Sequence, residues 1–266
     1  MQTQVPPLLL ILIFHTSASL ICTHNCEQTF NISQPFNGFG HSCGRPVENA
    51  YRCYVKMQFF FHLNEVTTFL ETDTLSDQDF IRIEPNRTKH FFYQIAHGCN
   101  HSDDCARIFA EKKMIEMKEK AYDVTYILND FDSLLSRTDT NQELTCYDGN
   151  RTTDQCSTPD KLCFLEHNQI SDETNALSCP QEYINPTVNI IVNDEGVGAR
   201  LYVRCSRRLC NTAETVNEVK HILFKHKITD KNGRTRSWTT NIGITPIGVS
   251  FKIILALLFI CIVNLK

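Results

Sequence analysis

The stretch from Leu144 to Asn211 opens on Leu144-Thr-Cys-Tyr and closes on Val203-Arg-Cys-Ser-Arg-Arg-Leu-Cys-Asn, with three further cysteines between these ends. A segment of about 65 residues built mostly of loops buries little apolar surface and needs cross-links to be stable. Closing a loop of fewer than about 20 residues with a disulfide contributes roughly 3 kcal/mol. The six cysteines therefore predict a disulfide-rich β module.

These residues resemble the three-finger domain family, which includes the urokinase receptor, the complement inhibitor protectin and snake neurotoxins. The resemblance is carried by the Cys-Tyr opening, the Cys-x6-Cys pair and the terminal Cys-x4-Cys-Asn. It implies the disulfides Cys146–Cys163, Cys156–Cys179 and Cys205–Cys210. It also implies that Asn211 holds the opening strand through side-chain hydrogen bonds to the backbone. Two other bridges common in the family, across the first loop and at the base of the third, have no cysteines here.

The fingers of this family are recognition loops, so the resemblance implies binding rather than catalysis. The implied pairs place the finger tips near Asn150, at Gln169 to Asp172 and at Asp194 to Gly198. We take four residues at the second and third tips as candidates for partner binding: Gln169, Asp172, Asp194 and Glu195. Replacing Asp194 and Glu195 with lysine is expected to weaken binding of an extracellular or cell-surface protein partner.

The region 20–137 alternates cysteines with aromatic runs such as Tyr54 to Leu63 and His90 to Ala96, which predict strands. Six cysteines fall here, and a diverged three-finger unit would fit the pairs Cys22–Cys53, Cys26–Cys43 and Cys99–Cys105. Six cysteines nevertheless allow fifteen connectivities. Both this pairing and the fold of the first half stay open at the level of sequence.

Between Ser102 and Ser136 apolar residues recur every three or four positions, which predicts one long amphipathic helix or two with a break near Tyr122. We expect this stripe to pack on the neighbouring sheet; the alternative is a self-associating coiled coil. Asp103 and Asp104 suit the start of the helix. The stripe contains Met114, Met117, Ala121, Val124, Leu128, Phe131 and Leu135.

A polar stretch at 138–141 predicts a linker before the three-finger-like domain at 144–212. Within that domain, 187–193 and 199–205 read as a hairpin. The segment 213–240 reads as a helix opened by a capping box at Thr215 to Glu218, then a turn at Asp230 to Gly233 and a stem. Its cationic residues are interpreted as a solvated stem: Lys220, Lys225, Lys227, Lys231, Arg234 and Arg236. The fold class is α+β, a three-finger β module preceded by a cysteine-rich β region and a long helix.

The two apolar ends predict a secreted, membrane-anchored protein. Residues 1–19 have the layout of a signal peptide. Residues 241–266 fit a glycosylphosphatidylinositol (GPI) anchor signal, with attachment at Asn241 or Gly243. The alternative is a single-pass transmembrane helix reaching back to Ile244, with Lys252 inside the span. Four Asn-x-Ser/Thr sequons predict glycan attachment: Asn31, Asn86, Asn100 and Asn150.

The thirteen cysteines favour an oxidising compartment outside the cytosol, in agreement with the predicted secretion. Cys261 lies in the apolar tail, which leaves twelve in two groups of six. The net charge of −4, from 26 basic and 30 acidic residues, argues against nucleic-acid binding.

Three patterns in the sequence resemble sites of chemistry, but their context favours a structural role. Gly40-His-Ser-Cys-Gly matches a nucleophile elbow in letters, but it follows a loop-like segment instead of a strand. Cys22, Cys26, His24 and His41 have spacing that zinc accepts, yet disulfides are favoured in a secreted chain. Asp130 and Asp132 read as solvated acidic residues. We therefore expect no enzyme, metal or cofactor, but a surface glycoprotein on the outer face of the plasma membrane; the alternative is a self-associating adhesion or coat glycoprotein.

Overall fold

The computed structural model describes residues 20–40, 43, 46–72, 80–86, 90–136, 143–148, 150, 152–156, 162–177, 179, 189–194 and 198–235. The expected signal peptide at 1–19, the linker at 138–141, the finger-tip residue Glu195 and the anchor signal at 241–266 lie outside these residues. Among the described residues, no helix is both long and apolar enough to cross a membrane.

The described part is mostly β-sheet with three helices and six disulfides, a disulfide-rich α+β fold. The elements of the first half are β1 (Leu20–Cys22), β2 (Cys26–Asn31), β3 (Val47–Ala50), β4 (Cys53–Phe60), β5 (Glu65–Thr72), β6 (Phe80–Asn86), β7 (His90–Cys99), α1 (Cys105–Lys120) and α2 (Val124–Leu135). Those of the second half are β8 (Thr145–Tyr147), β9 (Thr153–Gln155), β10 (Cys163–Asn168), β11 (Glu173–Leu177), β12 (Asn189–Asp194), β13 (Ala199–Cys205) and α3 (Ala213–Lys225).

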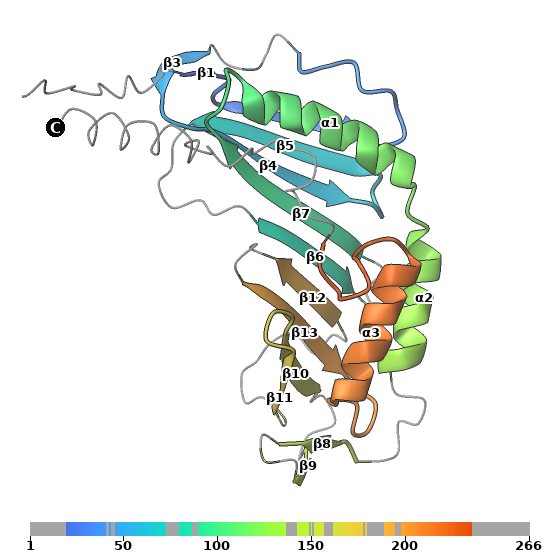
Figure 1. Cartoon of the computed structure of the whole chain (residues 1–266). Coiled ribbons are helices and arrows are strands. Elements are labelled where there is room, and N and C mark those ends of the chain that lie inside the picture. Colours follow the sequence, from blue (N-terminus) through green and yellow to red (C-terminus); the bar gives the residue numbers. More distant parts are fainter. Residues whose placement is uncertain are drawn as a thin grey trace, which may run out of the picture.

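Nine strands form one antiparallel sheet in the order β11-β10-β13-β12-β6-β7-β4-β5-β2. The strands β6 and β12 join the two halves, with Ile83 opposite Val192. Figure 1 shows the sheet passing as one layer through both halves, with β6 and β12 side by side at its centre. Two-stranded sheets, β1–β3 and β8–β9, lie outside it.

The two halves repeat the same strand order, β5-β4-β7-β6 in the first and β11-β10-β13-β12 in the second. Cysteines mark corresponding places in both: Cys53 lies opposite Cys99, and Cys163 lies opposite Cys205. A helix follows the last cysteine of each half, α1 after β7 and α3 after β13. The halves are therefore structural repeats, joined at the edges of their third hairpins.

Each strand alternates its side chains between the two faces of the sheet, and the helices cover the face that carries the buried apolar residues. In β13, Leu201, Val203 and Cys205 are buried, whereas Tyr202 and Arg204 between them are half-buried. The helix α1 packs on β4, β5 and β7, and α2 packs on β6 and α3. The helical stripe contributes Met114, Met117, Phe131 and Leu135 to this core, so the expected packing on the sheet is confirmed. The break near Tyr122 is also present, with Ala121 in the left-handed region (φ 42°).

The six disulfides are Cys22–Cys53, Cys26–Cys43, Cys99–Cys105, Cys146–Cys163, Cys156–Cys179 and Cys205–Cys210. These are the pairs named from the sequence for both halves.

Two details of the helix starts differ from the sequence-based expectation. Asp104 does not cap α1; its carboxylate accepts hydrogen bonds from the Thr23 backbone N–H (2.6 Å) and hydroxyl (3.0 Å). Helix α3 starts at Ala213, capped by the Thr212 hydroxyl, which accepts from the Thr215 N–H (3.2 Å). The expected capping box began three residues too late, because a second threonine precedes it.

Candidate binding surface

The face of the nine-stranded sheet opposite the helices, here called the open face, carries a row of polar side chains across all nine strands. Cross-strand partners lie on the same face of a sheet, so the register places these residues in one line. From β2 to β11 the row contains Thr29, Thr67, Gln58, Gln94, Arg82, Asn193, Arg200, Asn168 and Glu173.

Aromatic side chains flank this polar row. Phe60 and Phe92 are cross-strand partners with ring centroids 5.2 Å apart. On the other side of the row, the Lys56 ammonium lies over the Phe69 ring, 5.9 Å from its centroid. In β13, Arg204 lies over the ring of Phe164. Aromatic and arginine side chains are enriched where proteins bind partners, so the open face has the composition of a recognition surface.

The centre of the open face is hollowed at the join between the halves. This hollow, here called the seam hollow, has a volume of about 410 Å³. Three lining residues come from each half: Phe80, Arg82 and Gln94 from the first, and Ile191, Asn193 and Tyr202 from the second. A second hollow of about 290 Å³ adjoins it, since Phe80 lines both. The rest of its lining is Tyr54, Lys56, Phe69 and Glu71.

Two arginines of the open face are paired with carboxylates. Arg82 forms an ion pair with Glu84, and Arg200 forms one with Glu166 (2.7 Å). A hydrogen bond with Tyr202, followed by attraction to Glu166, raises the pKa of Arg200. The surface around the seam hollow therefore combines polar and aromatic groups with little net charge.

Gln94 stands out in the seam hollow because it is only 9% exposed. Its side chain lines the hollow, and its amide atoms are not among the fully enclosed, unpaired side-chain atoms of the described residues. Polar groups at such a place pair with protein, water or a ligand. The Gln94 amide is thus accessible to a molecule in the hollow.

The tip of the second finger, in contrast, is attached to the body of the protein. The Gln169 amide donates a hydrogen bond to the Gly233 carbonyl (2.7 Å). Gly233 has φ +81°, and a Cβ there would lie 2.7 Å from the Gln169 amide nitrogen, so glycine permits this close approach. Asp172 is exposed and forms an ion pair with Lys220 (3.3 Å). Gln169 therefore has a structural contact of its own, while Asp172 remains accessible.

The third finger is built into the sheet. The Asp194 backbone lies opposite Ile81 of β6 and Ala199 of β13. The side chain of Asp194 and all of Glu195 lie outside the described part.

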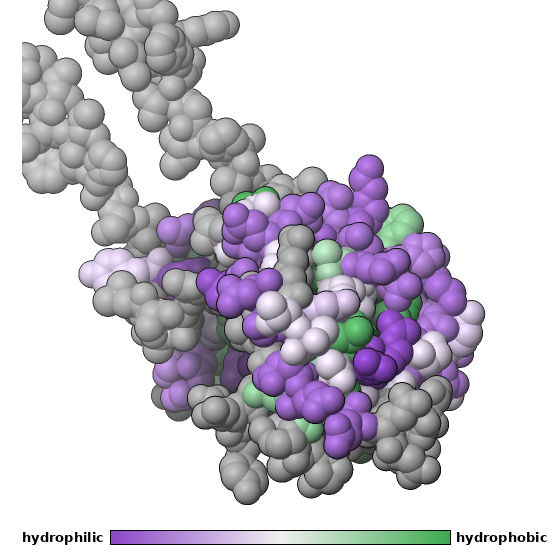
Figure 2. All heavy atoms as spheres, turned by 90° about the horizontal axis from the view of Figure 1, so that it is seen from below, coloured by the Kyte–Doolittle hydropathy of each residue, from purple (hydrophilic) through white to green (hydrophobic). Residues whose placement is uncertain are grey.

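Figure 2 shows the end of the molecule from below; its coloured surface is mainly hydrophilic, with scattered hydrophobic residues and no broad apolar area among them.

His167 lies beneath the second finger tip and is only 2% exposed. Its Nδ1 lies 2.8 Å from the Thr174 hydroxyl, and its Nε2 lies 3.4 Å from the Asp172 carboxylate. Burial, and then repulsion from Lys220, lower the pKa of His167, while Asp172 acts in the opposite direction. The imidazole is therefore neutral at neutral pH.

Asp130 and Lys225, both expected to be solvated, instead connect α2 to α3. The Asp130 carboxylate contacts the Lys225 ammonium (2.8 Å) and His226 Nε2 (2.7 Å). Burial raises the pKa of Asp130, but hydrogen bonds from Lys225 and His226 outweigh this effect and hold the pKa below its usual value. The periodicity of a single helix does not show which distant cation lies beside its acidic residue.

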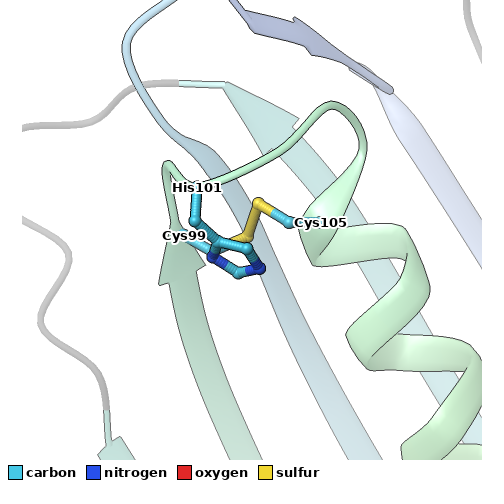
Figure 3. Close-up of side chains that lie close together, drawn as sticks. All are labelled: Cys99, His101 and Cys105. Atoms are coloured by element: carbon cyan, nitrogen blue, oxygen red, sulfur yellow. A yellow bond between two sulfur atoms is a disulfide. The ribbon is translucent and has the colours of Figure 1, made fainter. Parts of the chain in front are cut away.

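Two groups of side chains lie close enough together to be considered as metal ligands: Cys99, His101 and Cys105, and Cys146, Cys156 and Cys179. Figure 3 shows His101 beside the disulfide between Cys99 and Cys105. Metals bind thiolates, and every sulfur in both groups is in a disulfide. His24, weighed earlier as a zinc ligand, instead contacts the Thr72 N–H (3.2 Å).

The other candidate residues are placed as follows. Asn31, Asn100 and Asn150 are exposed, and Asn86 belongs to β6 with its side chain outside the described part. The elbow-like motif has Cys43 in a disulfide, whereas His41 and Ser42 lie outside the described residues.

No model of a known protein family matches the chain, and no curated protein matches it.

The open face was missed at the level of sequence. Its residues come from strands far apart in the chain, and only the register brings them together. A local signal existed in Arg200, Tyr202 and Arg204, which alternate with the buried Leu201 and Val203.

Proposed function

We propose that this protein is a cell-surface glycoprotein that carries two three-finger-type units and binds an extracellular protein partner through the open face of its sheet. The observation that carries the proposal is the seam hollow, with aromatic, amide and guanidinium groups from both halves around it. The hairpin tips support binding less well, because Gln169 is bonded to Gly233 and β12 is paired with β6.

Support for a three-finger unit in the second half comes from Asn211. Its side-chain oxygen accepts from the Tyr147 N–H (2.9 Å), and its amide donates to the Tyr147 carbonyl (2.7 Å). This is the role that the resemblance implies. The three hairpins β8–β9, β10–β11 and β12–β13 correspond to the three fingers.

The first half has a comparable fastening. Asp104 precedes Cys105 and binds the backbone of Thr23, the residue after Cys22. Asn211 likewise adjoins Cys210 and binds Tyr147, the residue after Cys146. An acidic side chain on the other side of the closing cysteine thus makes a similar contact, which supports a diverged three-finger unit here.

A binding experiment tests the role of the open face. Full-length protein released from transfected cells is assembled into fluorescent tetramers, which are used to stain a panel of cell lines. We expect Tyr202→Ser to lower staining at least about tenfold, because aromatic residues at an interface centre carry much of the binding energy. Asp172→Lys, at the hairpin tip, is expected to leave staining unchanged. The proposal would be contradicted if the Tyr202→Ser and unaltered proteins stained cells equally, or if only Asp172→Lys lost staining. Either result would favour binding through the finger tips.

The method of release tests the proposed anchor. A phosphatidylinositol-specific phospholipase C cuts a GPI anchor but leaves a transmembrane helix intact. We expect the enzyme to move the protein from the cell surface into the medium. Retention on the cells would favour the single-pass alternative.

A further inference from the structure

The seam hollow contains an amide side chain, Gln94, that is only 9% exposed and whose amide atoms are open to the hollow. A ligand that displaces water from this amide has to supply hydrogen bonds in its place. The Gln94 amide both donates and accepts hydrogen bonds. The matching ligand therefore needs groups that do both, as hydroxyls do.

The rest of the lining alternates apolar and polar surfaces. Phe80, Ile191 and Tyr202 supply two aromatic side chains and one aliphatic side chain, and the other three lining residues, Arg82, Gln94 and Asn193, are polar. A sugar ring has the complementary arrangement, with C–H patches that lie against aromatic rings and hydroxyls at its rim. A purely apolar ligand would leave the Gln94 amide without water, at a cost in free energy.

Charge and size narrow the class of ligand. The ion pair between Arg82 and Glu84 compensates the cation in the hollow, so the lining does not favour an anion. Its volume, about 410 Å³, lies within the range of small-molecule sites, roughly 300–1,000 Å³. Its position between two structural repeats is a common place for a ligand.

We propose that the seam hollow binds a neutral sugar residue, presented by a glycan on the partner, with Gln94 bonded to its hydroxyls and Tyr202 and Phe80 against its C–H face. The inference rests on the proposed function in placing recognition on the open face, and it adds the chemical class of the group recognised.

Saturation-transfer NMR on the full-length protein tests this inference. The protein is purified in a detergent without a sugar head group, its own N-glycans are trimmed, and the methyl glycosides of glucose, galactose, mannose and N-acetylglucosamine are titrated separately. We expect saturation transfer to at least one of them, with a Kd in about the millimolar range. Gln94→Ala is expected to weaken that binding by roughly tenfold, since one hydrogen bond is lost. Gln155→Ala changes the same residue type on β9, away from the hollow, and is expected to have no effect.

Three results would overturn the inference: no transfer to any of the four glycosides from protein whose thermal unfolding is normal, equal affinity in the Gln94→Ala and unaltered proteins, or tighter binding of N-acetylneuraminic acid than of every neutral glycoside. The cell-staining experiment separates this inference from the proposed function. If Tyr202→Ser abolishes staining while no sugar binds, only the sugar assignment fails. If a sugar binds through Gln94 but Tyr202→Ser leaves the staining of cells unchanged, the proposed protein-binding role of the open face fails.

Discussion

The two halves of the sheet share a strand order and a cysteine frame, but they fasten the tips of their second hairpins differently. In the first half, the Phe61 ring stacks on Phe91 (centroids 5.1 Å apart) and meets the edge of Tyr122 between α1 and α2 (5.2 Å). In the second half, Gln169 bonds to Gly233 and Asp172 pairs with Lys220. The same arrangement of strands and disulfides is thus compatible with either an apolar or a polar contact between the tip of the second hairpin and the following helical segment. This contact is here called the clasp.

This difference shows which part of the repeat is required for the fold and which part is free to vary. The paired strands and disulfides recur in both halves because they close each hairpin unit. The contact between the tip and the following helical segment varies in chemistry, and so the response of each half to mutation and pH differs. Three experiments sharpen the comparison.

The largest effect is expected from removing corresponding disulfides. Cys22→Ala/Cys53→Ala opens a bridge of sequence separation 31, and Cys146→Ala/Cys163→Ala opens one of separation 17. Each double variant should lose about 3 kcal/mol of unfolding free energy, slightly more for the longer loop. Denaturant unfolding of the purified proteins measures both. A loss in only one half would show that the shared frame does not stabilise the two halves alike.

A smaller effect is expected from weakening the clasps themselves. Phe61→Ala should cost about 2 kcal/mol, because a half-buried aromatic ring is removed from two others. Gln169→Ala should cost about 1 kcal/mol, the value of a typical hydrogen bond. Ile170→Ala is a control at the same tip, because Ile170 is 53% exposed. A larger cost for Gln169→Ala than for Phe61→Ala would reverse our ranking of the clasps.

The smallest effect is expected in the dependence of stability on pH. The pKa of His167 lies below its ordinary value of 6.5, mainly through burial. The unfolded chain therefore binds more protons below about pH 6.5, so stability falls as the pH is lowered from 7 towards 5. His167→Gln should flatten this fall in thermal unfolding measured across that range.

His62 at the first tip provides the comparison for this experiment. Burial, and then His90, lower the pKa of His62 as well. Its side chain is half-buried, whereas His167 is almost fully buried, so His62→Gln should flatten the pH profile less. The opposite ranking would contradict the assignment of the pH response to the second half.

Much of the frame was predictable from the sequence. The aromatic runs predicted β4 and β7, with the difference that Phe61 to Asn64 form a turn in which Asn64 takes a positive φ of 58°. The three disulfide pairs of the second half are those that the resemblance to three-finger domains implied, and the three of the first half match one connectivity among the fifteen that the sequence left open. The helical stripe was visible because its period of three to four residues is local.

The join between the halves was not predictable in the same way. Pairing of β6 with β12 depends on two edges that are distant in sequence, and no local pattern sets that register. Because the join was hidden, so was the seam hollow, whose lining comes from four strands. The hydrogen bond of Gln169 was hidden as well, because its partner Gly233 lies on a turn 64 residues further along the chain.

The pairing of β6 with β12 also matters for the order in which the growing chain can fold. Ribosomes complete β6 well before they reach β12, so the outer edge of β6 has unpaired backbone groups while the second half is being made. Such an edge can pair with another chain. The newly made first half therefore carries an open strand edge until Asn189 to Asp194 pair with β6, and a chaperone that covers β6 would block pairing with another chain during that time.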